Sequence, residues 1–513
     1  MKMKKLLTLL LAVLLLAGCA GNKPGTFEAG KNTFLLNGKP FVVKAAEVHY
    51  PRIPREYWEH RIEMCKALGM NTLCLYVFWN LHEETPGKYD FTGNKDIAAF
   101  CKLAQKHGMY VIVRPGPYVC AEWEMGGLPW WLLKNDSVQL RTLDPFYMQH
   151  VGAFMHEVGK QLQDLQITRG GNIIMVQVEN EYGSYGTDNG LDWTSTIAII
   201  PWNIYLFYGD SKLLADCYEN IKRYVDYVDR TSPSGLTSWG RGDWVPVKSH
   251  SSKELTSSVY FYVDTKILAN AAKLFNKQED YEHYQALAEK IRQAINDKYL
   301  NRETGIYASG VQTELSVPLM WGIVPKDMKA KVARNLAKKV QEAGFHLDVG
   351  VLGAKAILNA LSENGEAETA YKVAAQDTYP SWGCWIANGA TTLLENWDLN
   401  ATRDISDNHM MFGEIGGWFY KGLGGIFPDP QQPGFKHILL RPNFPSDLKQ
   451  FEARHHSPYG EIHSQWVRKK KSVVYSVTIP ANSSATLYVP DTVKGERVIE
   501  LEAGKHTFEW KLL

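Results

Sequence analysis

The pattern of hydrophobic and polar positions changes its period near residue 190. Upstream of that point, four short apolar runs bounded by Gly, Pro or Asn alternate with amphipathic stretches, and these runs are 41–48, 71–77, 109–114 and 173–178. Such runs predict buried strands, and their alternation with helices predicts a parallel sheet. We therefore expect residues 30–188 to form part of a (β/α) TIM-type barrel, which four strands alone leave open.

Downstream of residue 190 the apolar positions recur at helical spacing instead. One stripe consists of Leu214, Cys217, Ile221, Tyr224 and Val228, and comparable stripes continue to about residue 422. Roughly ten helical segments are predicted, about one pair fewer than six helical hairpins require. Residues 189–425 are therefore expected to form an incomplete (α/α)6 toroid, which makes the chain multidomain.

The last part of the chain, residues 426–513, shows strict alternation. Val473, Tyr475, Val477 and Ile479 fall on one face of a strand, and further short strands separated by turn residues follow. This pattern predicts a small antiparallel β-sandwich. The sequence assigns no chemistry to it.

The first nineteen residues are predicted to be a targeting signal. Three lysines within the first five residues precede an apolar run that is short for a bilayer span and ends in Leu16-Ala17-Gly18-Cys19. This ending resembles a bacterial lipoprotein box. The resemblance implies cleavage before Cys19, acylation of its thiol and a lipid-anchored protein of the cell envelope, periplasmic or in the outer membrane, with residues 20–29 as a linker. The alternative is a chance cysteine after an ordinary signal peptide.

Composition excludes some functions and favours another. The formal net charge of +1 gives no electrostatic basis for binding nucleic acid. The sequence contains no metal-binding, nucleotide-binding or redox motif, so we expect no metal and no cofactor. Of the 16 tryptophans, many adjoin Gly, Pro, Asp or Asn. We expect about half of these to serve packing and the rest to stack on sugar rings, which present an apolar C–H face. They are Trp79, Trp123, Trp130, Trp131, Trp193, Trp244, Trp382 and Trp397.

Chemically active side chains follow each of the four predicted strands. These strand ends carry Glu47-Val48-His49-Tyr50, Tyr76-Val77-Phe78-Trp79, Ala121-Glu122-Trp123 and Glu179-Asn180-Glu181. The carboxyl ends of parallel strands meet at one edge of a sheet, which is where such folds place their active sites. A single glutamate there would most often be structural. The set of four predicts a site.

Residues 27–186 resemble the retaining β-galactosidases of glycoside hydrolase family 35. The matching motifs are His49-Tyr50-Pro51-Arg52, Tyr76-Val77-Phe78-Trp79-Asn80-Leu81-His82-Glu83 and Gln177-Val178-Glu179-Asn180-Glu181-Tyr182-Gly183. The resemblance implies that Glu181 is the general acid/base and that Asn180 binds the hydroxyl next to the anomeric carbon. It also implies that Tyr76, Ala121 and Glu122 line a galactose pocket. The family's nucleophile follows a later strand that this sequence lacks, whereas a retaining site needs a second carboxylate about 5 Å away.

Residues 191–513 resemble the α-L-rhamnosidases of glycoside hydrolase family 78. The motifs include Gly242-Asp243-Trp244, Thr378-Tyr379-Pro380-Ser381-Trp382-Gly383, Glu395-Asn396-Trp397-Asp398 and Asn408-His409. The resemblance implies that Glu395 is the general base of an inverting mechanism and that Trp193, Asp243, Trp244 and His409 surround the rhamnose. The family's general acid lies in an upstream motif that is absent here. Taken singly, Glu395 would be interpreted as a helix-surface charge and His409 as a core histidine.

The leading hypothesis is a glycoside hydrolase that removes terminal glycosyl residues from oligosaccharides or plant-type glycans. If the two halves pack together, Glu181 and Glu395 are hypothesised to share one cleft, which a separation far outside about 5–10 Å would exclude. A second hypothesis is a non-catalytic glycan-binding protein at the cell surface. A third is an inactive fusion of two gene fragments, with exposed sheet edges and poor folding; soluble expression with a cooperative melt would contradict it.

Overall fold

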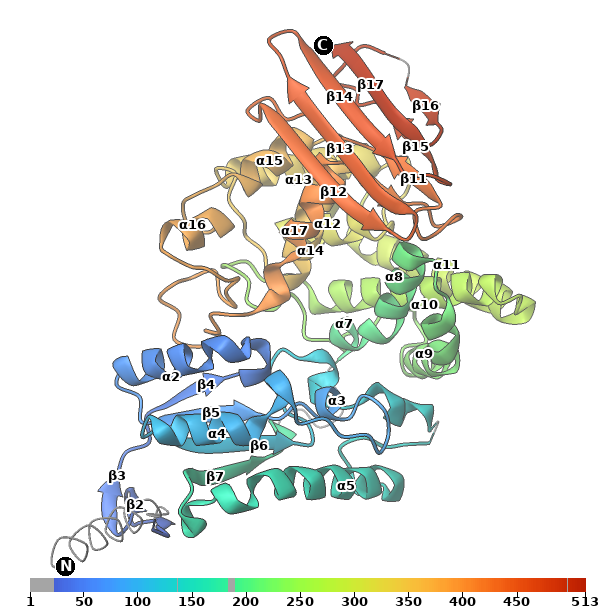
Figure 1. Ribbon diagram of the computed structural model, residues 1–513. Coiled ribbons are helices and arrows are strands. Elements are labelled where there is room, and N and C mark those ends of the chain that lie inside the picture. Colours follow the sequence, from blue (N-terminus) through green and yellow to red (C-terminus); the bar gives the residue numbers. More distant parts are fainter. Residues whose placement is uncertain (1–22, 136, 183–189, 496) are drawn as a thin grey trace, which may run out of the picture. The chain divides into compact units, whose positions relative to one another are not determined.

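The computed structural model describes residues 23–135, 137–182, 190–495 and 497–513. The chain divides into two compact units, residues 1–188 (unit 1) and residues 189–513 (unit 2), and each is described by itself (Figure 1). The predicted signal over residues 1–19, with Cys19, lies outside the described residues. Within the described part of the chain, no helix combines the length and the apolar character needed to cross a membrane.

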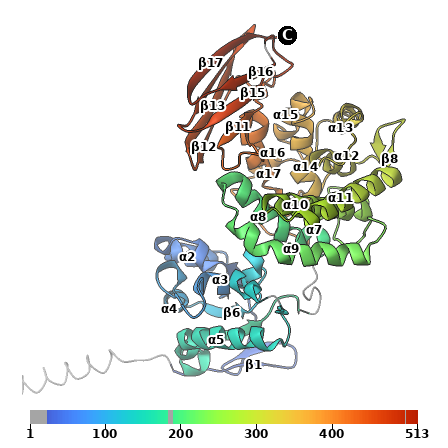
Figure 2. The ribbon, with the colours of Figure 1, turned by 90° about the vertical axis from the view of Figure 1, so that its right-hand side faces the viewer.

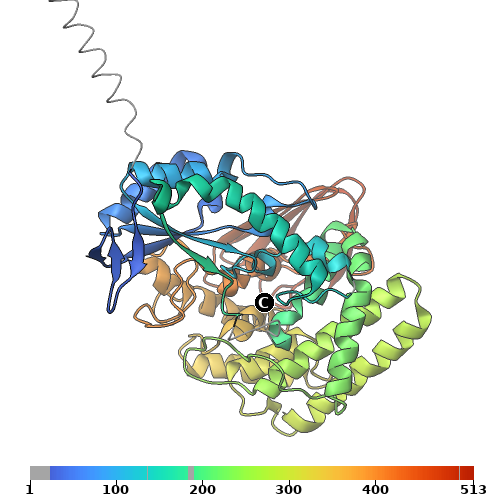
Figure 3. The same ribbon diagram turned by 90° about the horizontal axis from the view of Figure 1, so that it is seen from below.

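Unit 1 is built on a parallel sheet of four strands in the order β4-β5-β6-β7. The strands are β4 (Ala45–Val48), β5 (Thr72–Tyr76), β6 (Tyr110–Gly116) and β7 (Ile173–Val178). The helices between them are α2 (Trp58–Ala67), α3 (Trp79–His82), α4 (Ile97–Lys106) and α5 (Pro145–Leu162), the last of which runs along the sheet in Figure 3. Because all four strands run in one direction, their carboxyl ends lie at one edge.

The first strand of the parallel sheet begins at Ala45, so the prediction that it begins at Phe41 is wrong. Phe41 does not belong to the parallel sheet but ends β3 (Lys39–Phe41) of a separate antiparallel sheet with β1 (Phe27–Ala29) and β2 (Phe34–Leu36). Asn37 and Gly38 both have positive φ, 52° and 75°, which suits a two-residue hairpin turn. The hairpin ends the apolar run early, and β1 takes in residues 27–29 that the sequence assigned to a linker.

The core of unit 1 lies around β5 and β6. β5 is buried along its whole length, and the Trp79 ring stacks on Phe154 of α5 with centroids 5.1 Å apart. The edge strand β7 differs, because Val176 and Val178 are 52% and 72% exposed. The sheet as described therefore ends in an apolar edge at β7.

The first part of unit 2 consists of helices (Figure 2). They are α7 (Leu191–Thr194), α8 (Thr196–Tyr208), α9 (Lys212–Thr231), α10 (Lys253–Leu274), α11 (Gln278–Tyr299), α12 (Gln312–Met320), α13 (Lys329–Glu342), α14 (Val351–Ser362), α15 (Ala367–Ala374), α16 (Trp382–Ala387) and α17 (Glu414–Trp418). A two-stranded ribbon, β8 (Leu300–Asn301) with β9 (Ile306–Tyr307), follows α11.

The helices of unit 2 alternate between two kinds. α10, α12 and α14 are buried on nearly all sides, whereas α9, α11 and α13 bury one stripe and expose the other face. A helix that is buried all round belongs to the interior, and an amphipathic helix belongs to the outer layer. This alternation is that of a toroid of helical hairpins, and it places the loops that precede the inner helices next to one another.

The C-terminal part of unit 2 contains two four-stranded sheets. One has the order β10 (Ile426–Pro428), β11 (His437–Leu440), β15 (Ser484–Tyr488), β16 (Val498–Leu501), and the other β12 (Gln450–Ser457), β13 (Gly460–Arg468), β14 (Ser472–Ile479), β17 (Gly504–Lys511). The predicted inward face of β14, residues 473, 475, 477 and 479, is buried as expected. The β11–β15 pair is parallel, which differs from the predicted all-antiparallel sandwich. The Trp466 indole N–H donates to the Leu423 carbonyl at 3.2 Å and joins this domain to the helices.

A buried histidine in α3 makes the stability of unit 1 depend on pH. His82 is fully buried, its Nε2 lies 3.0 Å from the Tyr50 hydroxyl and its Nδ1 lies 2.8 Å from the Asp90 carbonyl oxygen. Burial lowers the pKa of His82 to about 4. Between about pH 6.5 and 4, His82 is therefore protonated in the unfolded chain and neutral in the folded chain. The stability that the neutral, buried His82 contributes is lost as the pH falls through that window.

We expect the free energy of unfolding of unit 1 to fall by up to about 3 kcal/mol from this group between pH 7 and pH 4. His82→Asn should flatten the pH dependence, whereas the exposed His60→Asn should not. The free energy of unfolding of each variant is measured as a function of pH by urea unfolding, which is monitored by hydrogen exchange in peptides from β5. An equal pH dependence in wild type and His82→Asn would contradict the assignment.

Candidate functional site

The strand-end residues of unit 1 are held together by Arg114, at the end of β6. One guanidinium nitrogen donates to Glu47 at 3.0 Å and to the Tyr76 hydroxyl, and the other donates to the Asn180 side-chain oxygen. The guanidinium carbon also lies 4.3 Å from the centre of the Tyr76 ring. Arg114 thus connects the ends of β4, β5 and β7. The sequence placed it at a strand end without assigning it this role.

His49 packs against the same cluster. Its ring centroid lies 4.7 Å from that of Tyr76 in an edge-on arrangement. Burial, followed by the charges of Arg52 and Arg114, lowers the pKa of His49 to about 4. The imidazole is therefore neutral near pH 7 and can offer one donor and one acceptor to a hydroxyl group.

The segment that carries Glu181 is held by a second arginine. Glu179 and Glu181 have positive φ angles of 61° and 49°, a conformation that costs free energy for residues with side chains. Arg141 compensates, because it is ion-paired with Glu179 at 2.9 Å and donates to the Asn180 carbonyl at 2.7 Å. Glu181 itself is exposed. Glu179 is therefore committed to holding the turn, and Glu181 is the carboxylate that the turn presents.

The loop after β6 presents Ala121 and Glu122. Three consecutive residues, Cys120 to Glu122, have positive φ angles of 59°, 57° and 47°. Arg52 donates to the carbonyl oxygens of Ala121 at 3.3 Å and Glu122 at 2.7 Å, which stabilises this strained loop. The structure thus brings Tyr76, Asn180 and Glu47 into one network around Arg114 and attaches the Ala121–Glu122 loop through Arg52.

In unit 2, Asp243 is buried and its oxygens are used by the chain itself. They accept hydrogen bonds from the Thr313 hydroxyl and from the backbone N–H groups of Gly350 at 2.8 Å, Leu352 at 2.8 Å and Gly353 at 3.1 Å. Three of these donors begin α14, so Asp243 caps that helix and ties it to α12. Asp243 in this position fixes the loop, and its place around a rhamnose stays a prediction from the resemblance.

Trp193 and Trp244 are half-buried beside this loop. The Trp244 carbonyl accepts from Val351 N–H at 2.9 Å, and the Arg241 guanidinium carbon lies 6.0 Å from the Trp193 ring centre. Asp192 receives the backbone N–H groups of Arg241 and Gly242 at 2.7–3.0 Å. Burial raises the pKa of Asp192, and these hydrogen bonds oppose the rise. Two buried aspartates therefore fix the loop that carries Trp244 and tie it to α7, which carries Trp193.

Glu395 and His409 lie on a second, longer loop before α17. The Glu395 carboxylate accepts from Ser406 N–H at 3.1 Å, and its own N–H donates to the Ser406 carbonyl at 2.9 Å. His409 donates its backbone N–H to the Leu393 carbonyl at 2.9 Å, and its Nδ1 accepts from Met411 N–H at 3.2 Å. Both side chains are half-buried. The loop therefore presents a fixed carboxylate and an imidazole from neighbouring segments.

A cluster of aromatic rings supports this second loop. Trp397 is 1% exposed, stacks on Trp385 at 4.8 Å and lies 4.3 Å from the ring centre of Phe412. Its indole N–H donates to the Val349 carbonyl at 2.9 Å, which joins the loop to the start of α14. Trp382 is also buried, and its N–H donates to the Phe412 carbonyl at 3.0 Å. Trp382 and Trp397 are therefore packing residues.

Burial sorts the eight tryptophans much as expected. Trp79, Trp131, Trp382 and Trp397 are buried, whereas the other four are half-buried or exposed. Among the described residues, Glu59, Glu63 and His107 form the group that offers three ligand atoms for a metal ion. It lies on α2 and after α4, away from the strand ends, and Lys106 already pairs with Glu59 at 2.8 Å.

Comparison with known proteins assigns the two parts of the chain to different families. Residues 33–203 match glycosyl hydrolases family 35, residues 135–423 match the bacterial alpha-L-rhamnosidase 6 hairpin glycosidase domain, and residues 425–504 match the bacterial alpha-L-rhamnosidase C-terminal domain. These matches support the hybrid inferred from the motifs.

Curated relatives match about a third of the chain. A beta-galactosidase of Xanthomonas manihotis is 48% identical over 164 residues, which is 32% of this chain and 27% of that protein. A beta-galactosidase of Felis catus is 46% identical over 188 residues, covering 36% and 28%. The chain therefore spans little more than a quarter of the length of these relatives.

Solved structures match a larger share of the chain. An alpha-L-rhamnosidase from Dictyoglumus thermophilum superposes with a TM-score of 0.58 at 32% identity, covering 63% of this chain and 40% of that one. The Streptomyces avermitilis alpha-L-rhamnosidase, complexed with L-rhamnose, gives 0.57 at 27% identity, covering 61% and 32%. The match to glycosyl hydrolases family 35 begins earlier than the rhamnosidase hairpin match, at residue 33, and overlaps it up to residue 203. Because the rhamnosidase hairpin match over residues 135–423 takes in more than half of the 513 residues, the chain belongs to the bacterial alpha-L-rhamnosidase six-hairpin glycosidase family.

Proposed function

We propose that this protein acts on terminal glycosyl residues of complex glycans, and that unit 2 takes an α-L-rhamnosyl residue at the loops of Glu395 and His409. Both families that the chain matches are glycoside hydrolases, which supports O-glycosyl hydrolysis as the reaction class. The observation that carries the proposal is the Glu395 carboxylate, which Ser406 holds on a loop anchored by the buried Trp397.

The proposed chemistry in unit 2 is an inverting displacement. Glu395 takes a proton from a water molecule, whose oxygen bonds to the anomeric carbon while the glycosidic C–O bond breaks. A general acid about 6.5–9.5 Å from the base protonates the departing oxygen. Asp192 and Asp243 do not suit that second role, because backbone N–H groups occupy their oxygens. Turnover therefore depends on an acid outside this pair of buried aspartates.

Non-catalytic glycan binding is a second candidate, and the contacts in unit 1 favour it there. Glu179, whose side chain is 15% exposed, is held by its ion pair with Arg141, and the more exposed Glu47 pairs with Arg114. A retaining reaction at Glu181 needs a nucleophilic carboxylate about 5 Å away. The proposed contacts to a galactosyl residue come from Tyr76, Asn180 and the Ala121–Glu122 loop. Unit 1 is therefore proposed to bind the sugar without cleaving it.

Glu395→Gln should lower hydrolysis of an aryl α-L-rhamnoside by at least about a hundredfold, because the amide cannot accept the proton from water. Initial rates for purified wild type and variant measure this loss. The exposed Glu303→Gln in the same unit is the matched control and should behave as wild type. A wild-type rate that survives in Glu395→Gln would contradict the assignment of the base.

Glu181→Gln should leave galactose binding to the protein nearly unchanged, since the amide keeps the size and most of the hydrogen-bonding capacity of the acid. Neither wild type nor variant should hydrolyse an aryl β-galactoside. Calorimetric titration with galactose and a chromogenic assay test the two statements. Hydrolysis that disappears in Glu181→Gln would overturn the binding interpretation and establish a working galactosidase site.

Asp243→Asn should reduce the free energy of unfolding of unit 2 by about 1–3 kcal/mol, because the new NH2 group faces backbone donors at the start of α14. Thermal denaturation of the full chain measures the effect. Asp216→Asn, which removes an exposed pair with Lys212, is the control and should change little. Unaltered stability together with weaker L-rhamnose binding would show instead that Asp243 contacts the sugar.

A further inference from the structure

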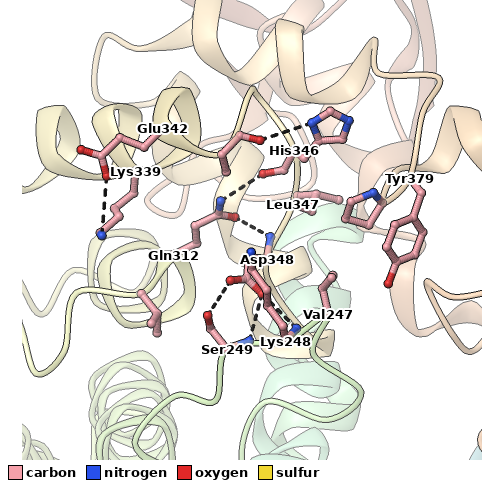
Figure 4. A pocket seen from close by; sticks show the side chains of 13 residues that line it. Val247, Lys248, Ser249, Gln312, Lys339, Glu342, His346, Leu347, Asp348 and Tyr379 are labelled. Carbon is pink, nitrogen blue, oxygen red and sulfur yellow. Dashed lines mark hydrogen bonds and ion pairs between the residues drawn. The ribbon is translucent and has the colours of Figure 1, made fainter.

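A cavity of about 460 Å³ lies in unit 2, and none of the candidate site residues described above lines it (Figure 4). Its walls come from the loop before α10, the start of α12, the end of α13 with the loop that follows it, and the segment before α16. Its size falls within the range of about 300–1,000 Å³ that is usual for small-molecule sites. The motifs that carry the rhamnosidase resemblance touch it only at Tyr379 and Pro380.

The polar groups of the cavity are fixed by hydrogen bonds to one another. Asp348 accepts from the backbone N–H groups of Lys248 at 3.1 Å and Ser249 at 3.0 Å, and its own N–H donates to Gln312 at 2.9 Å. The Gln312 amide donates in turn to the His346 carbonyl at 3.0 Å. Figure 4 shows this network along the cavity wall. Groups held in this way lose little conformational entropy when a ligand binds.

The charges that line the cavity balance. Lys248 and Lys339 carry positive charge, and Glu342 and Asp348 carry negative charge, with Lys339 3.6 Å from Glu342. A site of this kind has no net field to attract a phosphate or a sulfate. Tyr379 is 48% exposed and offers an aromatic face at the rim. An uncharged ligand with many hydroxyl groups and an apolar face fits these features, and a pyranose has both.

The cavity adjoins the loop that carries Glu395. Tyr379 lies three residues before Trp382, whose indole N–H donates to the Phe412 carbonyl at 3.0 Å. Asp348 lies next to Val349, whose carbonyl accepts from Trp397 at 2.9 Å. Two hydrogen bonds therefore connect the walls of the cavity to the loop of Glu395 and His409. The loop and the cavity are therefore neighbours within unit 2.

We propose that this cavity is an accessory subsite for a neutral pyranose unit of the same glycan, with the Tyr379 ring as the stacking surface. The proposal rests on the function proposed above for unit 2 and extends it, because it makes the preferred ligand an oligosaccharide and not a single sugar. It holds whether the bound glycan is hydrolysed or only retained.

The test compares two ligands on the full-length protein, in the Glu395→Gln background so that neither is consumed. L-rhamnose and a neutral trisaccharide that ends in α-L-rhamnose are titrated by calorimetry. We expect the trisaccharide to bind about tenfold more tightly, and Tyr379→Ala to abolish that gain without changing the affinity for L-rhamnose. Tyr379→Phe, which keeps the ring, should retain the gain, as should Tyr208→Ala at the exposed end of α8. Circular dichroism melts establish that the variants are folded.

The possible failures are distinct. If L-rhamnose binds and the trisaccharide binds no better, or if Tyr379→Ala keeps the gain, the subsite is overturned while the proposed function of unit 2 stands. If neither ligand binds to the folded protein, the proposed function fails and the subsite fails with it. Tighter binding of a sulfated or phosphorylated sugar than of the neutral trisaccharide would also overturn the assignment of a neutral ligand.

Discussion

The arrangement of unit 2 around its site depends on the burial of one carboxylate, that of Asp243. A buried charge is costly unless every lone pair is used, and Asp243 meets this condition with Thr313 and with three N–H groups at the start of α14. Gly350 has to be a glycine for this contact, because a Cβ there would lie 2.2 Å from the Trp244 carbonyl oxygen. The loop with Trp244, the start of α14 and the start of α12 are thereby fixed together. The carbonyl oxygen of Val349, one residue earlier, accepts a hydrogen bond from the Trp397 indole N–H. This bond links the start of α14 to the loop of Glu395.

In unit 1, buried or half-buried arginines hold distant segments together, as the Asp243 carboxylate does in unit 2. Arg52, Arg114 and Arg141 each bridge segments that are distant in sequence, and each satisfies carbonyl or carboxylate oxygens at the ends of strands. The positive φ angles at Ala121, Glu122, Glu179 and Glu181 are tolerated because these arginines hold the loops. The consequence for function is that Glu47 and Glu179 act as structural partners. Glu181, in contrast, is exposed.

Binding a sugar and hydrolysing it place different physical requirements on the two units. Binding a sugar needs rings and hydrogen-bonding groups that are already in place, which hydrogen bonds within each unit provide. Hydrolysis needs in addition two carboxylates at a set separation. In the part of unit 1 that the structure describes, β7 is the last strand of its sheet, and Val176 and Val178 are exposed there. The proposed subsite at Tyr379 adds to binding and not to catalysis, so it is consistent with either outcome.

Periodicity and motifs were sufficient to find most elements and both families. Apolar runs located β5, β6 and β7, the alternation in β14 gave its buried face, and local motifs around Glu181 and Glu395 pointed to two kinds of glycosidase. These features are local, so the sequence determines them directly. It did not determine that Phe41 belongs to a hairpin, that Trp397 is a packing residue or that Asp243 caps a helix. Those outcomes depend on partners far along the chain, such as Gly350, 107 residues from Asp243. Only the tertiary structure decides which polar groups are satisfied internally, and therefore which remain for a ligand.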